Sequence, residues 1–148
     1  TSVSTPAGAG GDLITKARTL VGTPYQLGGY RTHRDNPRLG IDCSEYTSWI
    51  YSGTGVNLPE NAQMQCHATP RIDKSQLQPG DLVFFQGTYD VGNGDYITHV
   101  GMYVGDGKMI NAQTGGVMEA NLNDPYWASH YAGAGRVARP AATNSAPR

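Results

Sequence analysis

The stretch Gly40-Ile41-Asp42-Cys43-Ser44-Glu45-Tyr46 carries the strongest local signal in the chain, a helix start with a cysteine in its first turn. Asp42 is a good N-cap, and Glu45 three residues later completes a capping-box pattern, so Cys43 falls at the first helical position. A sulfur placed there meets unpaired backbone N–H groups and the positive end of the helix dipole, which stabilise a thiolate. The carboxylates of Asp42 and Glu45 oppose that effect. A reactive Cys43 therefore needs a basic partner from elsewhere in the chain.

The composition around this stretch indicates one loop-rich domain. The 148 residues are enough for a full hydrophobic core. Apolar residues make up 38% and charged residues 16%, with 20 glycines and 9 tyrosines, which suits an α+β domain better than a helical bundle. The net charge of −1 argues against general binding to nucleic acids or anionic membranes. No apolar run approaches the roughly 20 residues that a membrane span needs.

The two ends of the chain differ from its middle. Residues 1–11 (TSVSTPAGAGG) and 140–148 (PAATNSAPR) are small or polar and lack periodicity, so we expect flexible tails or linkers there. One domain is expected over residues 12–139. The chain starts at Thr1 without a recognisable signal sequence, which is typical of a processed form or an excised domain. Such tails favour a module of a larger protein, with simple terminal slack as the alternative.

Hydrophobic spacing predicts helices first and strands afterwards. Helices are expected over residues 12–21, 43–51 and 61–66. After the turn at Gln78-Pro79-Gly80-Asp81, short apolar or alternating runs predict strands at residues 82–85, 98–104, 108–112, 117–120 and 135–138. This order predicts an α+β domain with helices on one face of an antiparallel meander.

His99 is the best-placed candidate base for Cys43, because a cysteine nucleophile usually needs a histidine and a group that orients it. His99 begins a strand whose alternation can point it towards a facing helix. Asn111 follows twelve residues later, across the hairpin turn at Asp106-Gly107, so the two side chains should be near neighbours on adjacent strands. Asn111 can then hydrogen-bond the imidazole and fix its tautomer. The other histidines are His33, His67 and His130.

The second cysteine, Cys66, allows two further interpretations. A Cys43–Cys66 disulfide is possible, but two free thiols are favoured because a bridge would consume the thiol with the better helix position. Cys66-His67 could also join Cys43 and His99 in a zinc site, but the spacing fits no usual one. We therefore expect no metal.

Six motifs, taken in order, resemble those of the NlpC/P60 family of cell-wall cysteine peptidases. They are Gly22-Thr23-Pro24-Tyr25, Asp42-Cys43-Ser44, Leu58-Pro59 with Gln65, Pro79-Gly80-Asp81-Leu82-Val83-Phe84-Phe85, His99-Val100-Gly101-Met102-Tyr103-Val104-Gly105 and Met109-Ile110-Asn111-Ala112. The resemblance covers residues 12–139. The end of the chain, from Tyr126-Trp127 to Arg136-Val137, looks like members from Gram-positive phage tails and mobile elements.

The resemblance implies a papain-like α+β core and hydrolysis of amide bonds in peptidoglycan stem peptides, typically between D-γ-glutamate and the diamino acid. Carried over by motif, Cys43 is the nucleophile, His99 the base and Asn111 the orienting residue, with a thiolate–imidazolium pair. The positions that line the substrate site are matched by Tyr25, Asp42 and Ser44. Core packing is the alternative for Tyr25, and helix capping alone for the other two.

We expect a monomer, and the proposed family mechanism requires no metal or organic cofactor. It implies an extracellular, cell-wall or phage-tail location, with stem peptides as partners. Alternatives are a non-catalytic wall-binding or tail-structural module, and an amidase or acyltransferase on the same fold.

Three positions depart from the family pattern. Asn111 stands where histidine is more frequent, Glu45 where glycine usually follows, and Leu27 where tryptophan is usual. Two long loops, residues 30–39 and 86–98, are expected to flank the site.

For two further groups of side chains the sequence allows two interpretations each. The basic residues of the first loop, Arg31, His33, Arg34 and Arg38, either contact wall carboxylates or are solvated, and solvation is favoured. Trp127 and His130 are expected to be packing and surface residues, with sugar stacking by Trp127 as the alternative.

Overall fold

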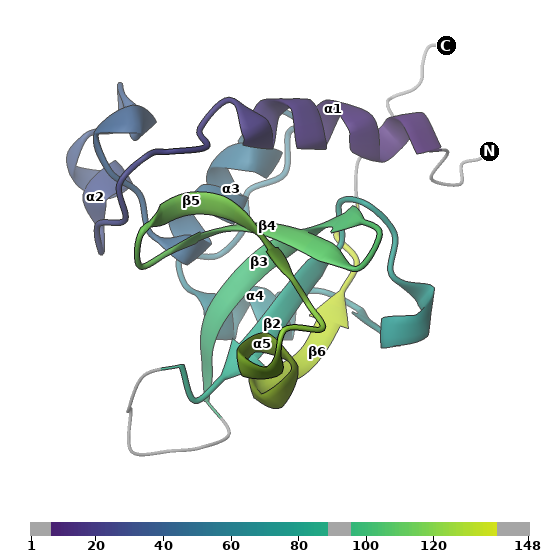
Figure 1. Ribbon diagram of the computed structural model, residues 1–148. Helices are drawn as coiled ribbons and strands as arrows, with labels where there is room; N and C mark the ends of the chain where they lie inside the picture. The colour runs from purple at the N-terminus through teal and green to yellow at the C-terminus, as the bar shows by residue number, and fades with distance from the viewer. Residues whose placement is uncertain (1–6, 89–95, 139–148) are drawn as a thin grey trace, which may run out of the picture.

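A computed structural model describes residues 7–88 and 96–138 of the chain (Figure 1). The helices are α1 (Ala7–Arg18), α2 (Gly29–Thr32), α3 (Cys43–Ser52), α4 (Ala62–Ala68) and α5 (Pro125–His130). Short 3-10 turns cover Pro37–Leu39 and Lys74–Gln76. The strands are β1 (Arg71–Ile72), β2 (Leu82–Gln86), β3 (Ile97–Gly105), β4 (Lys108–Gln113), β5 (Gly116–Asn121) and β6 (Tyr131–Gly135). The described chain is therefore an α+β domain, as predicted.

The strands form one antiparallel sheet in the order β1-β6-β2-β3-β4-β5. The predicted meander is present from β2 to β5, and β6 returns to pair with β2 and β1 on the far edge. The turn between β3 and β4 has Asp106 at φ 56° and Gly107 at φ 76°, the left-handed pair that a two-residue hairpin needs. This turn sets the register of the two strands that carry His99 and Asn111.

Both faces of the sheet are covered. On one face, Leu82 and Phe84 of β2 pack in the main core with residues of α1, α3 and α4. On the other face, Val83 and Phe85 pack with Trp127 of α5. Figure 1 shows α3 and α4 behind the sheet and α5 in front of it. Burial on both faces explains why β2 reads as a continuous apolar run rather than an alternating one.

Helix α1 differs from its predicted bounds, since it begins at Ala7 and ends at Arg18 instead of spanning residues 12–21. Its glycines made the segment resemble a linker, but Gly10 permits close packing, since a Cβ there would lie 2.7 Å from the Pro79 carbonyl oxygen. Residues 1–6 and 139–148, which include most of the predicted tails, lie outside the described residues.

The last strand also differs from the prediction, because β6 covers residues 131–135 rather than 135–138. Its sequence, Tyr-Ala-Gly-Ala-Gly, has little β propensity. The glycines serve packing, since a Cβ on Gly135 would lie 2.1 Å from Thr69 Oγ1. Helix α5, which immediately precedes β6, starts at the N-cap Asp124 with Pro125 at its first position.

Candidate active site

The start of α3 has the predicted geometry. The Asp42 carboxylate accepts a hydrogen bond from the Glu45 backbone N–H at 2.8 Å, and the Glu45 carboxylate accepts one from the Asp42 N–H at 3.0 Å. This reciprocal capping box places Cys43 at the first helical position, where only 8% of the residue is exposed. Cys43 and Cys66 are both free thiols.

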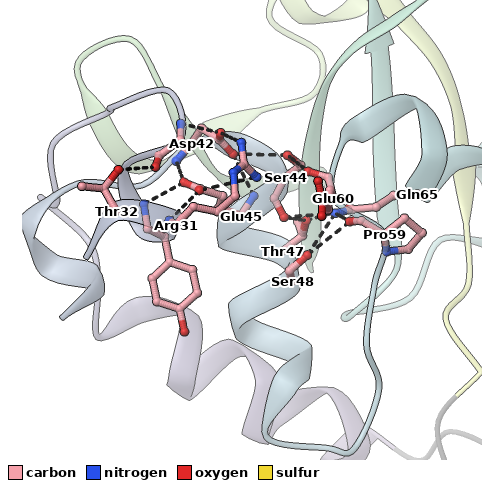
Figure 2. A network of polar contacts seen from close by, with 12 residues as sticks. Arg31, Thr32, Asp42, Ser44, Glu45, Thr47, Ser48, Pro59, Glu60 and Gln65 are labelled. Carbon is pink, nitrogen blue, oxygen red and sulfur yellow. Dashed lines mark hydrogen bonds and ion pairs between the residues drawn. The ribbon is translucent and has the colours of Figure 1, made fainter. Parts of the chain in front are cut away.

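The same two carboxylates hold the loop that contains α2 (Figure 2). Asp42 Oδ2 accepts from the Gly28 N–H at 2.9 Å, and the two Glu45 oxygens accept from the N–H groups of Tyr30 and Arg31 at 3.0 and 2.9 Å. The Arg31 guanidinium lies 3.9 Å from Asp42 and 3.7 Å from Glu45. Glu45 therefore joins the first long loop to α3, a role that the sequence did not reveal.

Ser44 belongs to a second part of this network (Figure 2). Its hydroxyl lies 3.2 Å from Asp42 Oδ1 and 3.0 Å from the Glu60 carbonyl oxygen. The Gln65 amide donates to the carbonyls of Ser44 and Pro59 at 3.0 and 2.9 Å. Ser44 and Asp42 are both buried, so each supports the site from beneath its surface.

Tyr25 lies at the surface beside the site. An isolated parallel bridge pairs Tyr25 with Ile41, two residues before Cys43, and 37% of Tyr25 is exposed. The exposure is inconsistent with the core-packing alternative. Leu27, where the family pattern has tryptophan, is 81% exposed.

His99 and Asn111 meet across the β3–β4 hairpin, with His99 Nε2 2.7 Å from Asn111 Oδ1. The Asn111 amide nitrogen donates to the Met118 carbonyl at 3.1 Å, which turns its oxygen towards the histidine. Strand pairing ends at Met102–Ile110, and Gly101 lies next to Asn111: a Cβ at Gly101 would be 3.1 Å from the Asn111 Cβ. The missing side chain at Gly101 leaves room for the imidazole to reach Asn111.

Trp127 of α5 stacks on the His99 ring, with centroids 5.1 Å apart and planes inclined by 26°. Phe85 approaches the same imidazole at 5.9 Å and packs edge-on against Trp127 at 4.9 Å. Trp127 was expected to be a packing residue, and what it packs against is the candidate base. Only the three-dimensional path of the chain reveals this contact.

The thiol of Cys43 lies against the beginning of β3. The backbone N–H of Val100, the residue after His99, hydrogen-bonds the Cys43 sulfur. Within residues 7–88 and 96–138, no hydrogen bond joins the Cys43 thiol directly to the His99 ring. Catalytic hydrogen bonds are often long until substrate is bound.

Burial sets the resting protonation of both groups. It raises the pKa of the Cys43 thiol to about 12, and the Asp42 charge adds to this while the Val100 N–H opposes it. Burial lowers the pKa of His99 to about 4, against the smaller raising effect of the Asn111 hydrogen bond. Because the pKa of the thiol lies above that of the imidazole, both groups rest in their neutral forms. This burial opposes the thiolate–imidazolium pair expected from the resemblance, which stays a prediction.

Neither a metal site nor a membrane-spanning helix is found in the described parts of the chain. No group of three or more histidine, cysteine or acidic side chains there could hold a metal ion. No described helix is long and apolar enough to cross a membrane.

Comparison with known proteins gives consistent matches. The model of the NlpC/P60 family matches residues 22–136. The bifunctional muramidase/DL-endopeptidase CwlT of Bacillus subtilis is 42% identical over 125 residues, which cover 84% of this chain and 36% of CwlT. The γ-D-glutamyl-L-lysine dipeptidyl-peptidase of Bacillus cereus is 37% identical over 133 residues, covering 88% of this chain and 37% of the relative.

A solved NLP/P60 family structure from Staphylococcus aureus, described as similar to a lipoprotein, superposes with a TM-score of 0.79. It is 33% identical to this chain, and the match covers 93% of this chain and 45% of that structure. The chain thus spans little more than a third of the length of the two curated relatives named above.

Proposed function

This chain belongs to the NlpC/P60 family, and from that premise we propose that it is a peptidoglycan hydrolase, a cysteine endopeptidase that cleaves stem peptides between D-γ-glutamate and the diamino acid. The observation that carries this proposal is a free thiol at the start of α3, a helix that packs against the strand whose His99 is oriented by a hydrogen bond of 2.7 Å to Asn111. Cys43, His99 and Asn111 then form the catalytic triad.

The proton transfers of the first step start from a neutral Cys43 thiol and a neutral His99 imidazole. His99 Nε2–H donates to Asn111 Oδ1, which leaves the Nδ1 lone pair as the base. When the sulfur of Cys43 bonds to the substrate carbonyl carbon, the thiol proton passes to Nδ1. The backbone N–H of Cys43, unpaired at the helix start, stabilises the oxyanion.

The second half of the reaction reuses the same groups. The imidazolium gives its proton to the leaving amine as the C–N bond breaks, and a thioester remains on Cys43. Water then attacks the thioester with His99 as base, which releases the carboxylic acid and restores the thiol. The face of Trp127 next to the imidazolium favours its transient charge.

The substrate side of the site is assigned to Tyr25, Asp42 and Ser44. The exposed ring of Tyr25 offers a surface to the peptide. Asp42 and Ser44 act through the positions of the helix start and the adjacent loop, since their polar atoms are occupied by protein partners.

The proposed setting is the bacterial cell wall. We place the domain outside the cytoplasm, as one module of a longer cell-wall protein, because relatives named as a muramidase/DL-endopeptidase and as an endopeptidase match it over only part of their length. We also propose that it is a monomer. Association with a phage tail is the other setting that the sequence suggests.

The decisive test is mass spectrometry of purified muropeptides after digestion by the wild type and by Cys43→Ala. The wild type should release fragments cut between γ-glutamate and the diamino acid, and Cys43→Ala should lower the rate by about 10⁵-fold or more. Cys66→Ala is the matched control and should keep full activity. Absence of Cys43-dependent products would overturn the proposal, and wall pelleting without cleavage would favour a binding module. Products cut elsewhere would indicate an amidase.

A further inference from the structure

A groove of about 210 Å³ lies on the face of α3 that points away from Cys43. Cys43 faces the sheet, since its sulfur accepts a hydrogen bond from the Val100 N–H of β3. Ser52 follows Cys43 by about two and a half helical turns, which places it on the opposite side of the helix. The groove floor lies on that side, in one stripe of residues spaced three or four apart: Glu45, Ser48, Trp49 and Ser52.

The walls of the groove are held in place by hydrogen bonds within the protein. One wall is the loop with α2, where the N–H groups of Tyr30 and Arg31 donate to Glu45 at 3.0 and 2.9 Å. The other wall is the segment before α4, where the Gln65 amide donates to the Pro59 carbonyl at 2.9 Å. Walls that are ordered before binding lose little conformational entropy, which favours specific recognition.

The polar groups of the floor already have partners. The Glu45 carboxylate accepts hydrogen bonds from three backbone N–H groups. The Ser48 hydroxyl accepts from the Gln65 amide at 3.2 Å, and the Ser52 hydroxyl donates to the Trp49 carbonyl at 2.7 Å. The floor therefore has few hydrogen bonds to offer a ligand.

Two aromatic rings line the same groove, those of Tyr30 and Trp49. Both side chains also pack against the main core, which limits their movement. Lys16 Nζ lies 4.7 Å from the centre of the Trp49 ring and covers one of its faces. The floor is thus largely aromatic, and it suits a ligand with an apolar face.

The edges of the groove carry exposed polar side chains. Arg31 and Arg34 belong to the α2 wall, and Asn57 and Glu60 belong to the opposite wall. Figure 2 shows Arg31 and Glu60 on opposite sides of the polar network. Within residues 7–88 and 96–138, the side chains of Arg34, Asn57 and Glu60 have no hydrogen bond or ion pair. Donors and acceptors are therefore free along both edges.

An aromatic floor between polar edges matches the shape of a pyranose sugar. The two faces of a β-linked glucosamine ring present C–H groups, whereas its hydroxyl and acetamido groups point outwards from the rim. One C–H face can pack on the Tyr30 ring while the rim groups meet the free side chains of the two walls.

Two other classes of ligand fit this groove less well. A polyanion would be attracted by Arg31 and Arg34 but repelled by Glu60 on the facing wall. A peptide recognised along its main chain needs unpaired backbone groups on the protein. The N–H groups of Tyr30 and Arg31 are already bound by Glu45, and α3 uses its own backbone groups within the helix.

We propose that this groove binds a segment of β-1,4-linked N-acetylhexosamine glycan, with the Tyr30 ring under the sugar and Arg34 and Asn57 at its edges. The choice of this polymer rests on the proposed function, because peptidoglycan stem peptides are attached to such a glycan. Glycan binding and peptide cleavage then use opposite faces of α3.

The test is a calorimetric titration with chitotetraose, a soluble β-1,4-linked N-acetylglucosamine oligomer without any peptide to cleave. The wild type should bind it with a Kd of about 1 mM. Tyr30→Ala should weaken binding about tenfold, because the sugar loses its aromatic surface. Asn57→Ala should weaken it about threefold through the loss of hydrogen bonds.

Two control variants accompany these substitutions. Tyr30→Phe keeps the ring and should bind chitotetraose as the wild type does. Asn123→Ala removes an exposed asparagine between β5 and α5, outside the groove, and should also leave binding unchanged. The melting temperature of Tyr30→Ala must be measured, because Tyr30 also packs against the main core.

Tryptophan fluorescence locates the bound sugar. The chain has two tryptophans, Trp49 in the groove and Trp127 stacked on His99. Chitotetraose should change the emission of the Trp127→Phe protein, in which Trp49 is the remaining tryptophan. A change in the Trp49→Phe protein instead would place the sugar at Trp127 and overturn the groove assignment.

The outcomes separate this inference from the proposed function. Absence of binding at about 10 mM chitotetraose, or binding that Tyr30→Ala and Asn57→Ala leave unchanged, would overturn the glycan site. Binding of poly-glutamate or a stem peptide in the groove, with none of chitotetraose, would also overturn it. If chitotetraose binds in the groove but muropeptides show no Cys43-dependent cleavage, the endopeptidase proposal fails and the glycan site stands.

Discussion

The two walls of the active site are built in different ways. The wall that carries Cys43 is polar: Asp42, Glu45 and the α2 loop are joined by several hydrogen bonds, each between 2.8 and 3.2 Å. The wall that carries His99 is aromatic, and one hydrogen bond of 2.7 Å to Asn111 supplies the polar contact that orients the ring.

This difference indicates where the site is vulnerable. Cys43, the proposed nucleophile, is held by several polar contacts, so loss of one of them should reduce stability more than catalysis. His99, the proposed base, depends on one hydrogen bond and one stacked ring, so loss of either should reduce catalysis more than stability. Three substitutions test this contrast, beginning with the largest expected effect.

Asn111→Ala should lower kcat/KM by about 10²-fold or more, because the imidazole loses the partner that fixes its tautomer and orientation. Rates on a muropeptide substrate should be compared with far-UV circular dichroism to confirm that the fold persists. Asn111→Asp is the matched control, since it keeps an oxygen acceptor for His99 and should retain more activity than Asn111→Ala. A loss below threefold in Asn111→Ala would show that Asn111 does not orient the base.

Trp127→Ala should lower kcat/KM by about tenfold. It should also shift the low-pH side of the pH profile of kcat/KM to higher pH. The proposed mechanism requires neutral His99, so activity should be lost as pH falls through the pKa of His99, which burial has lowered to about 4. Removing the stacked ring admits water, so that pKa should rise towards its ordinary value of 6.5 and the low-pH side of the profile should move to higher pH.

Trp127→Phe is the control for this experiment, because it keeps an aromatic face over the imidazole. Trp127→Phe should keep most of the wild-type kcat/KM, and the low-pH side of its pH profile should lie close to that of the wild type. A pH profile that is the same in Trp127→Ala and the wild type would contradict the role of the stacked ring and reduce Trp127 to ordinary core packing.

Glu45→Gln should have its main effect on stability, lowering the free energy of unfolding by about 2 kcal/mol. The amide that replaces one carboxylate oxygen cannot accept from the backbone N–H groups that Glu45 now serves. Urea denaturation gives the stability, and kcat/KM of the folded variant should stay within about threefold of wild type. Glu60→Gln, at an exposed position, should change neither. A large loss of kcat without loss of stability would remove the contrast between the walls.

The features that could be predicted from the sequence are those encoded over short distances. Asp42 and Glu45, three residues apart, predict a capped helix start. The Asp106-Gly107 turn sets the strand register that brings His99 to Asn111. Local chemistry determines both, because a cap and a two-residue turn have few conformational alternatives.

The features that escaped prediction depend on contacts between distant segments. Glu45 also binds the α2 loop, Trp127 reaches His99, and the glycine-rich β6 fills a place beside β2. None of these has a periodic signal, because burial by a remote partner decides them. The neutral state of Cys43 and His99 belongs to the same class, since it follows from desolvation by the assembled fold.

The short β3–β4 hairpin has a consequence for the order in which the protein folds. His99 and Asn111 are separated by only 12 residues, so closing the loop between them costs little entropy and their pairing can form early. Cys43 lies far upstream in the sequence, so it reaches His99 and Asn111 only when α3 packs against β3. A partly folded chain would then hold an oriented base but no nucleophile beside it. We expect pulsed hydrogen exchange during refolding to protect β3 and β4 amides before those of α3, with peptidase activity appearing only at the last step.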